Sequence, residues 1–153
     1  RVAAFPTMRC AAAADARMAL VCWRPLAENP WMEVPMTAAA RHLPPRPKPV
    51  PNAPGMFAFA DRDHVTDVLT AAGWVPPRFE KLDMDLDIAA GRGLEEAVVQ
   101  STQIGAVNSW LRNQPAEVVS AVVASLREAL APYANGASVR LPGAMWLISS
   151  APA

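Results

Sequence analysis

Three aspartates, Asp83, Asp85 and Asp87, stand at every second position, and closely spaced carboxylates are the ligands that calcium prefers. A calcium loop beginning at Asp83 needs glycine at its sixth position and glutamate at its twelfth. This chain has Ile88 and Leu94 there, so the spacing does not fit a calcium loop. We interpret the three aspartates as the solvated face of a strand, and we expect no metal site.

The stretch Gly91-Arg92-Gly93 could begin a phosphate loop, because it follows this strand and precedes a helical pattern. The third glycine of such a loop is replaced by Glu96, and Glu95 stands beside it. Two carboxylates at the start of a helix repel a phosphate, so we reject this site. The sequence contains neither a complete G-x-G-x-x-G motif nor a Walker A motif.

No group of nucleophiles and bases has the spacing of a known catalytic site. His42 and His64 fall in different predicted elements, and no serine stands in a nucleophile elbow. Cys10 and Cys22 share no metal or redox spacing, and both stand among apolar residues. We predict that they are small buried hydrophobic residues in a reducing compartment, without a disulfide.

The longest uninterrupted apolar run, Met18 to Trp23, predicts the element around which the fold is organised. Six apolar residues without alternation favour a strand buried on both faces, as in a parallel sheet covered by helices. Pro25 closes the run, and a helix would need about twice this length. We therefore predict a central strand over residues 17–23, with a buried helical turn as the alternative.

Periodicity and capping residues predict the remaining elements. Asp61 suits an N-cap, Asn29 a second N-cap before Pro30, and Pro142-Gly143 a break in the last strand. We expect helices over residues 3–14 (with Phe5, Met8 and Ala12 on one side), 30–43, 61–73, 94–113 and 115–133, and strands within 74–88 and 138–149. The Pro-rich stretch 44–54 is interpreted as an extended connection, with a ligand for a proline-recognising domain as the alternative.

Composition restricts the class of protein. The chain has 153 residues, 52% of them hydrophobic and 18% charged, which is typical of a globular domain. Its 14 basic and 14 acidic residues cancel, so there is no basic excess of the kind that favours nucleic-acid binding. No apolar run approaches the ~20 residues that span a bilayer. We therefore expect a cytoplasmic protein with no nucleic-acid partner and no membrane span.

Four segments together resemble a known family. They are residues 17–31 (RMALVCWRPLAENPW), 55–61 (GMFAFAD), 71–74 (AAGW) and the last strand, 139–149. Their order and spacing resemble class I S-adenosylmethionine-dependent methyltransferases, closest to the bacterial group that includes the ubiquinone and menaquinone enzymes. The resemblance implies an α/β, Rossmann-like fold. This chain would supply its C-terminal portion: strands five, six and seven with covering helices, the last strand antiparallel.

The resemblance also implies S-adenosylmethionine as the cofactor and a small molecule as the substrate. Where the family usually has Pro-Gly-Gly, this chain has Ala14-Asp15-Ala16. The family's glycine-rich cofactor loop and the acidic residue that holds the ribose have no counterpart. We therefore expect the N-terminal cofactor half to be absent, and the isolated chain to be inactive and to bind the cofactor weakly.

Ligands of such sheets bind beyond the carboxyl ends of the parallel strands. The resemblance therefore implies cofactor contacts from Trp23 and Arg24, and substrate contacts from Asn29 and Trp31. The helices over residues 94–134 would be an inserted lid over the substrate. The edge of the strand 17–23 would be exposed and could form a homodimer. A non-catalytic binding or dimerisation module and a proline-rich interaction protein are the alternatives.

Overall fold

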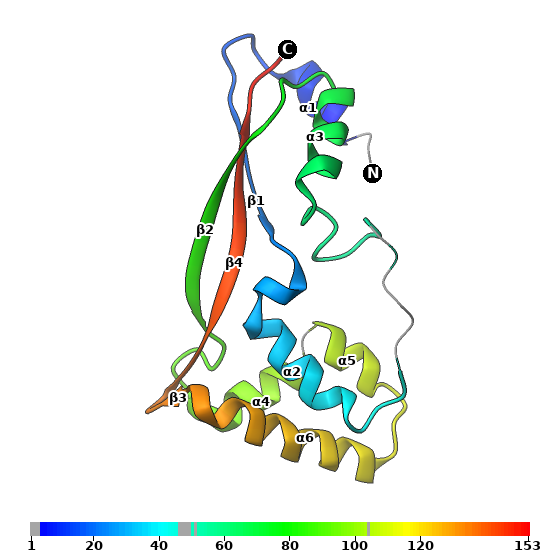
Figure 1. Cartoon of the computed structure of the whole chain (residues 1–153), viewed down its shortest axis with the longest axis vertical. Coiled ribbons are helices and arrows are strands. Elements are labelled where there is room, and N and C mark those ends of the chain that lie inside the picture. The colour runs from blue at the N-terminus through cyan, green and yellow to red at the C-terminus, as the bar shows by residue number, and fades with distance from the viewer. Residues whose placement is uncertain (1–3, 46–49, 51, 104) are drawn as a thin grey trace. The chain divides into compact units, whose positions relative to one another are not determined.

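The computed structural model describes residues 4–45, 50, 52–103 and 105–153, which form two compact units. Unit 1 comprises residues 1–28, 49–83 and 144–153, and unit 2 comprises residues 29–48 and 84–143. The elements (Figure 1) are α1 (Ala4–Ala11), β1 (Met18–Trp23), η1 (Leu26–Glu28), α2 (Pro30–Ala40), α3 (Arg62–Ala71), β2 (Arg78–Asp87), α4 (Gly93–Gln103), α5 (Gly105–Leu111), α6 (Ala116–Leu130), η2 (Ala131–Tyr133), β3 (Ala134–Asn135) and β4 (Ser138–Ser150).

The sheet has the order β1-β4-β2, and the short strand β3 pairs with β4. β4 is antiparallel to β1, with Met18 opposite Ser150 and Trp23 opposite Met145. Figure 1 shows that β2 also runs opposite to β4. The chain is therefore of mixed α/β class with an open antiparallel sheet. β4 is the middle strand, and β1, which we predicted to be central, lies at the end of this order.

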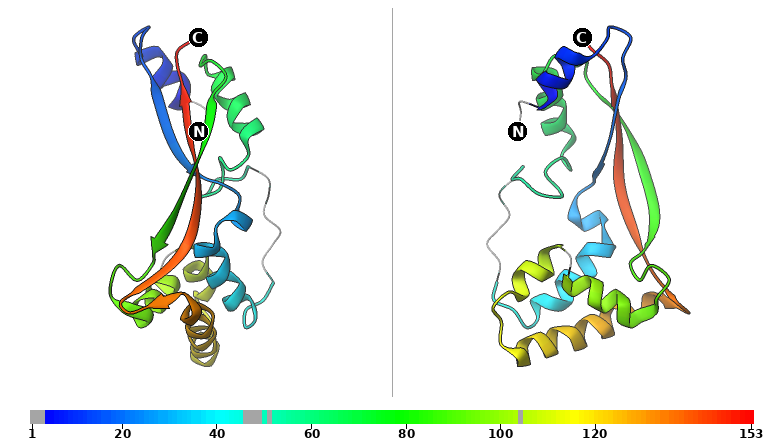
Figure 2. Two further views of the ribbon diagram at one scale, coloured as in Figure 1. Left: turned by 60° about the vertical axis from the view of Figure 1, so that its left-hand side comes forward. Right: turned by 180° about the vertical axis from the view of Figure 1, so that it is seen from behind.

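In unit 1, the helices α1 and α3 pack on the sheet. Phe5 of α1, Leu69 of α3 and Ile148 of β4 belong to one buried apolar cluster. Both views of Figure 2 show the two helices at the end of the sheet that carries the C-terminus. The Asp61 carboxylate caps α3 by accepting hydrogen bonds from the backbone N–H groups of Asp63 and His64, which confirms the predicted N-cap.

Two burial predictions in unit 1 are wrong. The strand over residues 18–23 is confirmed, but Val21 is 57% exposed and Ala19 is exposed as well. An antiparallel sheet packs one face and solvates the other, so the apolar run does not require burial on both. In α1, Met8 is 51% exposed and Cys10 is exposed, because the buried side of this helix carries Phe5.

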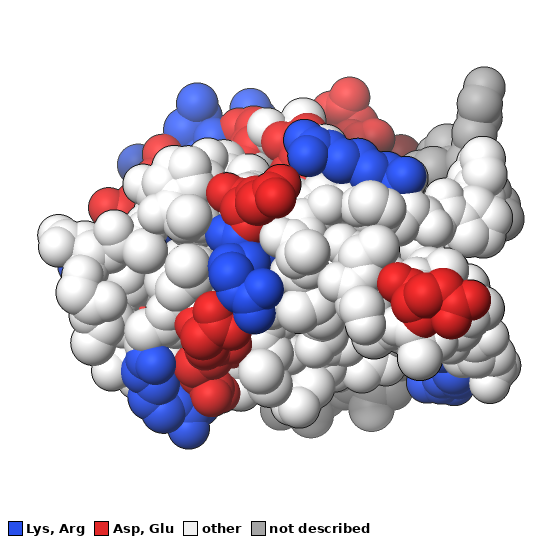
Figure 3. All heavy atoms as spheres, turned by 90° about the horizontal axis from the view of Figure 1, so that it is seen from below, with Lys and Arg blue, Asp and Glu red and all other residues white. Residues whose placement is uncertain are grey.

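Unit 2 is a helical cluster in which α6 packs against both α2 and α4. Its core contains Leu126 and Leu130 of α6 together with Ala38 and Ala39 of α2, all at most 1% exposed. The apolar stripe predicted for residues 115–133 is confirmed, and Pro115 occupies the N-cap position of α6. Figure 3, a view from below Figure 1, shows acidic and basic side chains intermixed, with no large area of one sign.

Two predicted boundaries differ in the structure. The helix expected over residues 94–113 is divided into α4 and α5, and Gly105 begins α5 at a φ of +70°. Such a backbone angle favours glycine and interrupts a continuous helix. Pro142-Gly143 does not break the last strand, because β4 is continuous from Ser138 to Ser150. Among the described residues, no helix combines the length and apolar character needed to cross a bilayer.

Candidate ligand-binding site

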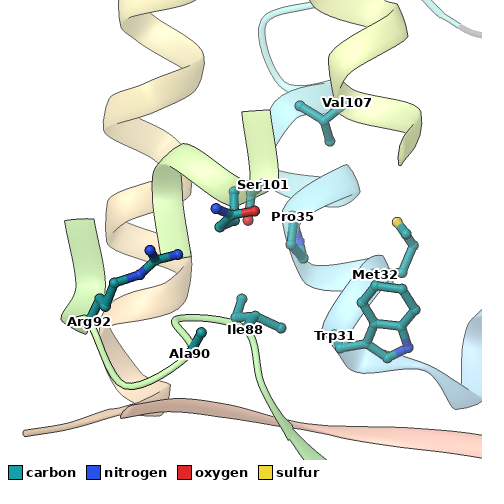
Figure 4. A pocket seen from close by; sticks show the side chains of 9 residues that line it. Trp31, Met32, Pro35, Ile88, Ala90, Arg92, Ser101 and Val107 are labelled. Atoms are coloured by element: carbon teal, nitrogen blue, oxygen red, sulfur yellow. The ribbon is translucent and has the colours of Figure 1, made fainter. Parts of the chain in front are cut away.

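Unit 2 contains a cavity of about 250 Å³ between α2, the turn after β2, α4 and α5 (Figure 4). Most of its lining is apolar, which is typical of small-molecule pockets. The lining residues are Trp31, Met32, Pro35, Ile88, Ala90, Arg92, Gln100, Ser101 and Val107. The volume lies just below the usual range of drug-sized pockets, about 300–1,000 Å³, so the cavity suits a compact ligand.

Two predicted substrate residues, Asn29 and Trp31, meet at the apolar wall of this cavity. Asn29 stands just before α2 and is completely buried. Its side chain does not cap the helix as we predicted; the Trp31 Nε1–H donates instead to Asn29 Oδ1 at 3.1 Å. Asn29 is the N-cap residue and Pro30 is the first residue of α2, so Trp31 is the second helical residue. It is also the first residue of α2 that lines the cavity. Asn29 therefore positions the indole, and Trp31 lines the cavity.

The turn after β2 is held by the Asp87 carboxylate. Asp87 Oδ1 accepts hydrogen bonds from the backbone N–H groups of Ala89 at 3.1 Å and Val139 at 3.0 Å, and Oδ2 accepts one from Gly91 at 3.1 Å. The Val139 bond is the largest cause that lowers the pKa of Asp87 below its ordinary value. This carboxylate fixes the turn that brings Ala90 and Arg92 to the cavity.

Arg92, Gln100 and Ser101 form the polar end of the cavity. Arg92 Nη2 donates to Glu96 Oε1 at 2.7 Å, and Gln100 Nε2 donates to the same oxygen at 2.6 Å. Ser101 Oγ donates to the Ala97 carbonyl at 2.8 Å. This set was not predicted from the sequence, although Glu96 and Gln100 share one face of α4 and Arg92 stands four residues before Glu96.

The predicted cofactor residues, Trp23 and Arg24, lie in unit 1. The Arg24 guanidinium is buried, and it donates to Glu28, with an Nε to Oε2 distance of 2.9 Å, and to Asp83. Its centre lies 5.3 Å from the centroid of the Trp146 ring. The hydrogen bond to Glu28 is the largest cause that raises the Arg24 pKa. These contacts give Arg24 a structural role, and the cofactor contacts stay a prediction.

Among the described residues, the other reactive side chains do not come together at the cavity. His42 Nε2 lies 2.7 Å from Ser125 Oγ, a pair that sequence spacing did not predict, and neither residue lines the cavity. Burial raises the pKa of the Cys22 thiol to about 11, so it stays protonated at neutral pH and is a poor nucleophile. Within the described ranges, no three His, Cys, Asp or Glu side chains are grouped so as to hold a metal ion.

Unit 1 contains two further hollows, of about 750 Å³ and about 600 Å³. The first is lined by Glu28, Asp61, Arg62 and Trp146 among others, and the second by Phe5, Phe59 and His64 among others.

A scan against protein-family models and a search among curated proteins found no match to this chain. The function therefore rests on the residues and their geometry.

Proposed function

We propose that this chain is the substrate-binding portion of an S-adenosylmethionine-dependent methyltransferase that acts on a small molecule. The observation that carries the proposal is the position of Trp31, which lines a compact apolar cavity and is held there by Asn29. Both residues belong to residues 17–31, one of the four segments that together resemble the family. The remaining walls include α4 and α5, which fall within the predicted lid over residues 94–134.

The sheet supports the same proposal. The resemblance implies that the last strand of the chain is antiparallel, and β4 pairs antiparallel with β1. β4 also lies between β1 and β2 in the sheet, so the chain must cross from one side of β4 to the other through the segment that includes α2 and α3. A crossover of this kind is typical of α/β folds, and it accounts for the helices between the two strands.

The cofactor contacts of Trp23 and Arg24 stay a prediction, and the described geometry adds no support to them. S-adenosylmethionine would supply a methyl group from its sulfonium centre. However, the Arg24 guanidinium is already bonded to Glu28 and Asp83, and neither Trp23 nor Arg24 lines any of the three cavities described above. We therefore assign substrate positioning and exclusion of water, but no contact with the cofactor, to the described residues around Trp31.

Label transfer tests the proposal. A longer polypeptide, in which residues 1–153 follow the cofactor-binding half that the resemblance implies, would be incubated with methyl-labelled S-adenosylmethionine and a small-molecule extract. The labelled products would be identified by mass spectrometry, and residues 1–153 alone should transfer no label. We expect label in the small-molecule fraction, at least about tenfold less with Trp31→Ala, and no change with Glu80→Ala on the exposed side of β2. Label found only on protein, or on nothing, would contradict the proposal.

The two alternatives make different predictions. A non-catalytic binding module would bind small molecules in the same cavity without transferring label. The proline-rich alternative depends on residues 44–54, of which 46–49 and 51 lie outside the described residues. The Pro44 carbonyl accepts a hydrogen bond from Trp110 Nε1 at 3.1 Å, so the start of this stretch is attached to unit 2.

A further inference from the structure

The cavity of unit 2 has two chemically different ends. Figure 4 shows Trp31 and Met32 on one side and Arg92 on the other, with Ser101 and Pro35 nearer the middle. Ile88 forms the wall between them. A ligand that fills this space must therefore have an apolar body on the Trp31 side and a polar group on the Arg92 side.

The polar end has unused hydrogen-bonding capacity. A guanidinium carries five N–H donors, and the Arg92 contact with Glu96 uses one of them. The Arg92 side chain is 61% exposed, so its remaining donors can reach a ligand or water. Glu96 Oε1 already accepts two hydrogen bonds, from Arg92 and from Gln100, and its side chain is only 25% exposed. The strongest group available to a ligand is therefore a cationic donor.

We infer that this cavity binds a compact, flat carboxylic acid, with its apolar ring against Trp31 and its carboxylate against Arg92. Arginine matches a carboxylate because its planar fork can donate two parallel N–H bonds. The Asn29 amide fixes the Trp31 indole, which provides a rigid apolar surface for the ring. The inference rests on the proposed function, since it names the substrate class of the same pocket.

Three probes of nearly equal size separate the possible head groups: phenylacetate, phenylacetamide and phenethylamine. Each would be titrated into the 153-residue chain and followed by the NMR signal of the Trp31 indole N–H, assigned with Trp31→Phe. We expect phenylacetate to bind about three- to tenfold more tightly than phenylacetamide, because Arg92 is exposed and partly neutralised by Glu96. Phenethylamine should bind most weakly.

Arg92→Gln should remove the preference for the acid while phenylacetamide binding stays within about twofold. That retained binding also shows that the variant is folded. Arg92→Lys should keep part of the preference, because it keeps the charge without the fork. Arg127→Gln is the matched control: Arg127 pairs with Glu95 on the surface of unit 2, does not line the cavity, and should leave the preference unchanged.

Three results would overturn the inference: amine binding as tight as acid binding, a preference for the acid that survives Arg92→Gln, or no response of the Trp31 signal to any probe. Its failure is distinguishable from failure of the proposed function. An acid preference without label transfer would leave the ligand class standing and remove the methyltransferase. Label transfer to amines, insensitive to Arg92→Gln, would do the reverse.

Discussion

Arg24 and its two carboxylate partners should respond unequally to mutation, because they are unequally buried. The Arg24 side chain is 7% exposed, whereas Glu28 is 42% exposed and Asp83 is 63% exposed. If the guanidinium is removed, water can solvate both carboxylates. If both carboxylates are removed, a buried positive charge loses its counter-charges and acceptors. The second change should therefore destabilise unit 1 more than the first.

The magnitudes follow from this asymmetry. Removing one partner of a fully buried ion pair lowers the free energy of unfolding by about 3–5 kcal/mol. Because Glu28 and Asp83 are about half exposed, we expect a smaller loss, about 2–3 kcal/mol, for the double variant Glu28→Ala with Asp83→Ala. Arg24→Met keeps apolar contact with the Trp146 ring and should change the free energy of unfolding by about 1 kcal/mol or less. The double variant should therefore lose at least about 1 kcal/mol more than Arg24→Met.

Urea denaturation followed by far-ultraviolet circular dichroism measures this difference without relying on tryptophan emission near the mutated site. Glu80→Ala is the control on the same strand. Glu80 pairs with Arg78 at 3.3 Å, and both side chains are more than half exposed, so the change should stay within about 0.5 kcal/mol. If Arg24→Met proved the more destabilising change, the argument from unequal burial would be refuted. If neither variant lost stability, the structural role of these contacts would be refuted, and a ligand-binding role for Arg24 would gain support.

Three further predictions concern the turn, the helix junction and the sheet edge. Asp87→Asn should destabilise the chain at neutral pH, and Asp85→Asn is the control. Because folding lowers the Asp87 pKa, the ionised carboxylate stabilises the fold above the unfolded pKa near 3.8. In acid denaturation, the stability difference between Asp87→Asn and wild type should therefore close as the pH falls below this value. Gly105→Ala should lower the free energy of unfolding by about 1–2 kcal/mol in thermal unfolding, because the Gly105 φ is +70°. Gly55→Ala, the control, should be nearly neutral. Equal melting temperatures for the two variants would contradict this prediction. The exposed edge of β1 should make the chain self-associate in light scattering, and Val21→Lys should favour the monomer; a wild-type monomer with rapid amide exchange along β1 would refute this.

Elements set by local interactions could be predicted from the sequence. Asp61 caps α3 because an aspartate just before a helix finds backbone donors within three residues. The strand over residues 18–23 follows from its apolar run and Pro25. What could not be predicted was which side of that strand would be covered. This depends on where α1 and α3 pack, and the run Met18–Trp23 is equally apolar on both faces.

The same distinction applies to the site. Trp31 was predicted as a substrate residue through the family resemblance, and it lines the cavity. Arg92 was considered only as part of a phosphate loop. Its role at the cavity became visible once the structure brought the turn after β2 next to α2, a contact between residues about 60 positions apart. A pocket assembled from such distant segments has no signature in a local sequence pattern.

The turn after β2 also explains why selectivity in this cavity should depend on a side chain and not on the backbone. A phosphate loop binds its anion through free backbone N–H groups. Here the protein's own Asp87 carboxylate takes the Gly91 N–H, and the Ala137 carbonyl takes the Gly93 N–H at 2.7 Å. The cation that remains for a ligand is the exposed Arg92 guanidinium. Recognition of an acid should therefore be modest, should weaken with salt, and should be removable by one substitution.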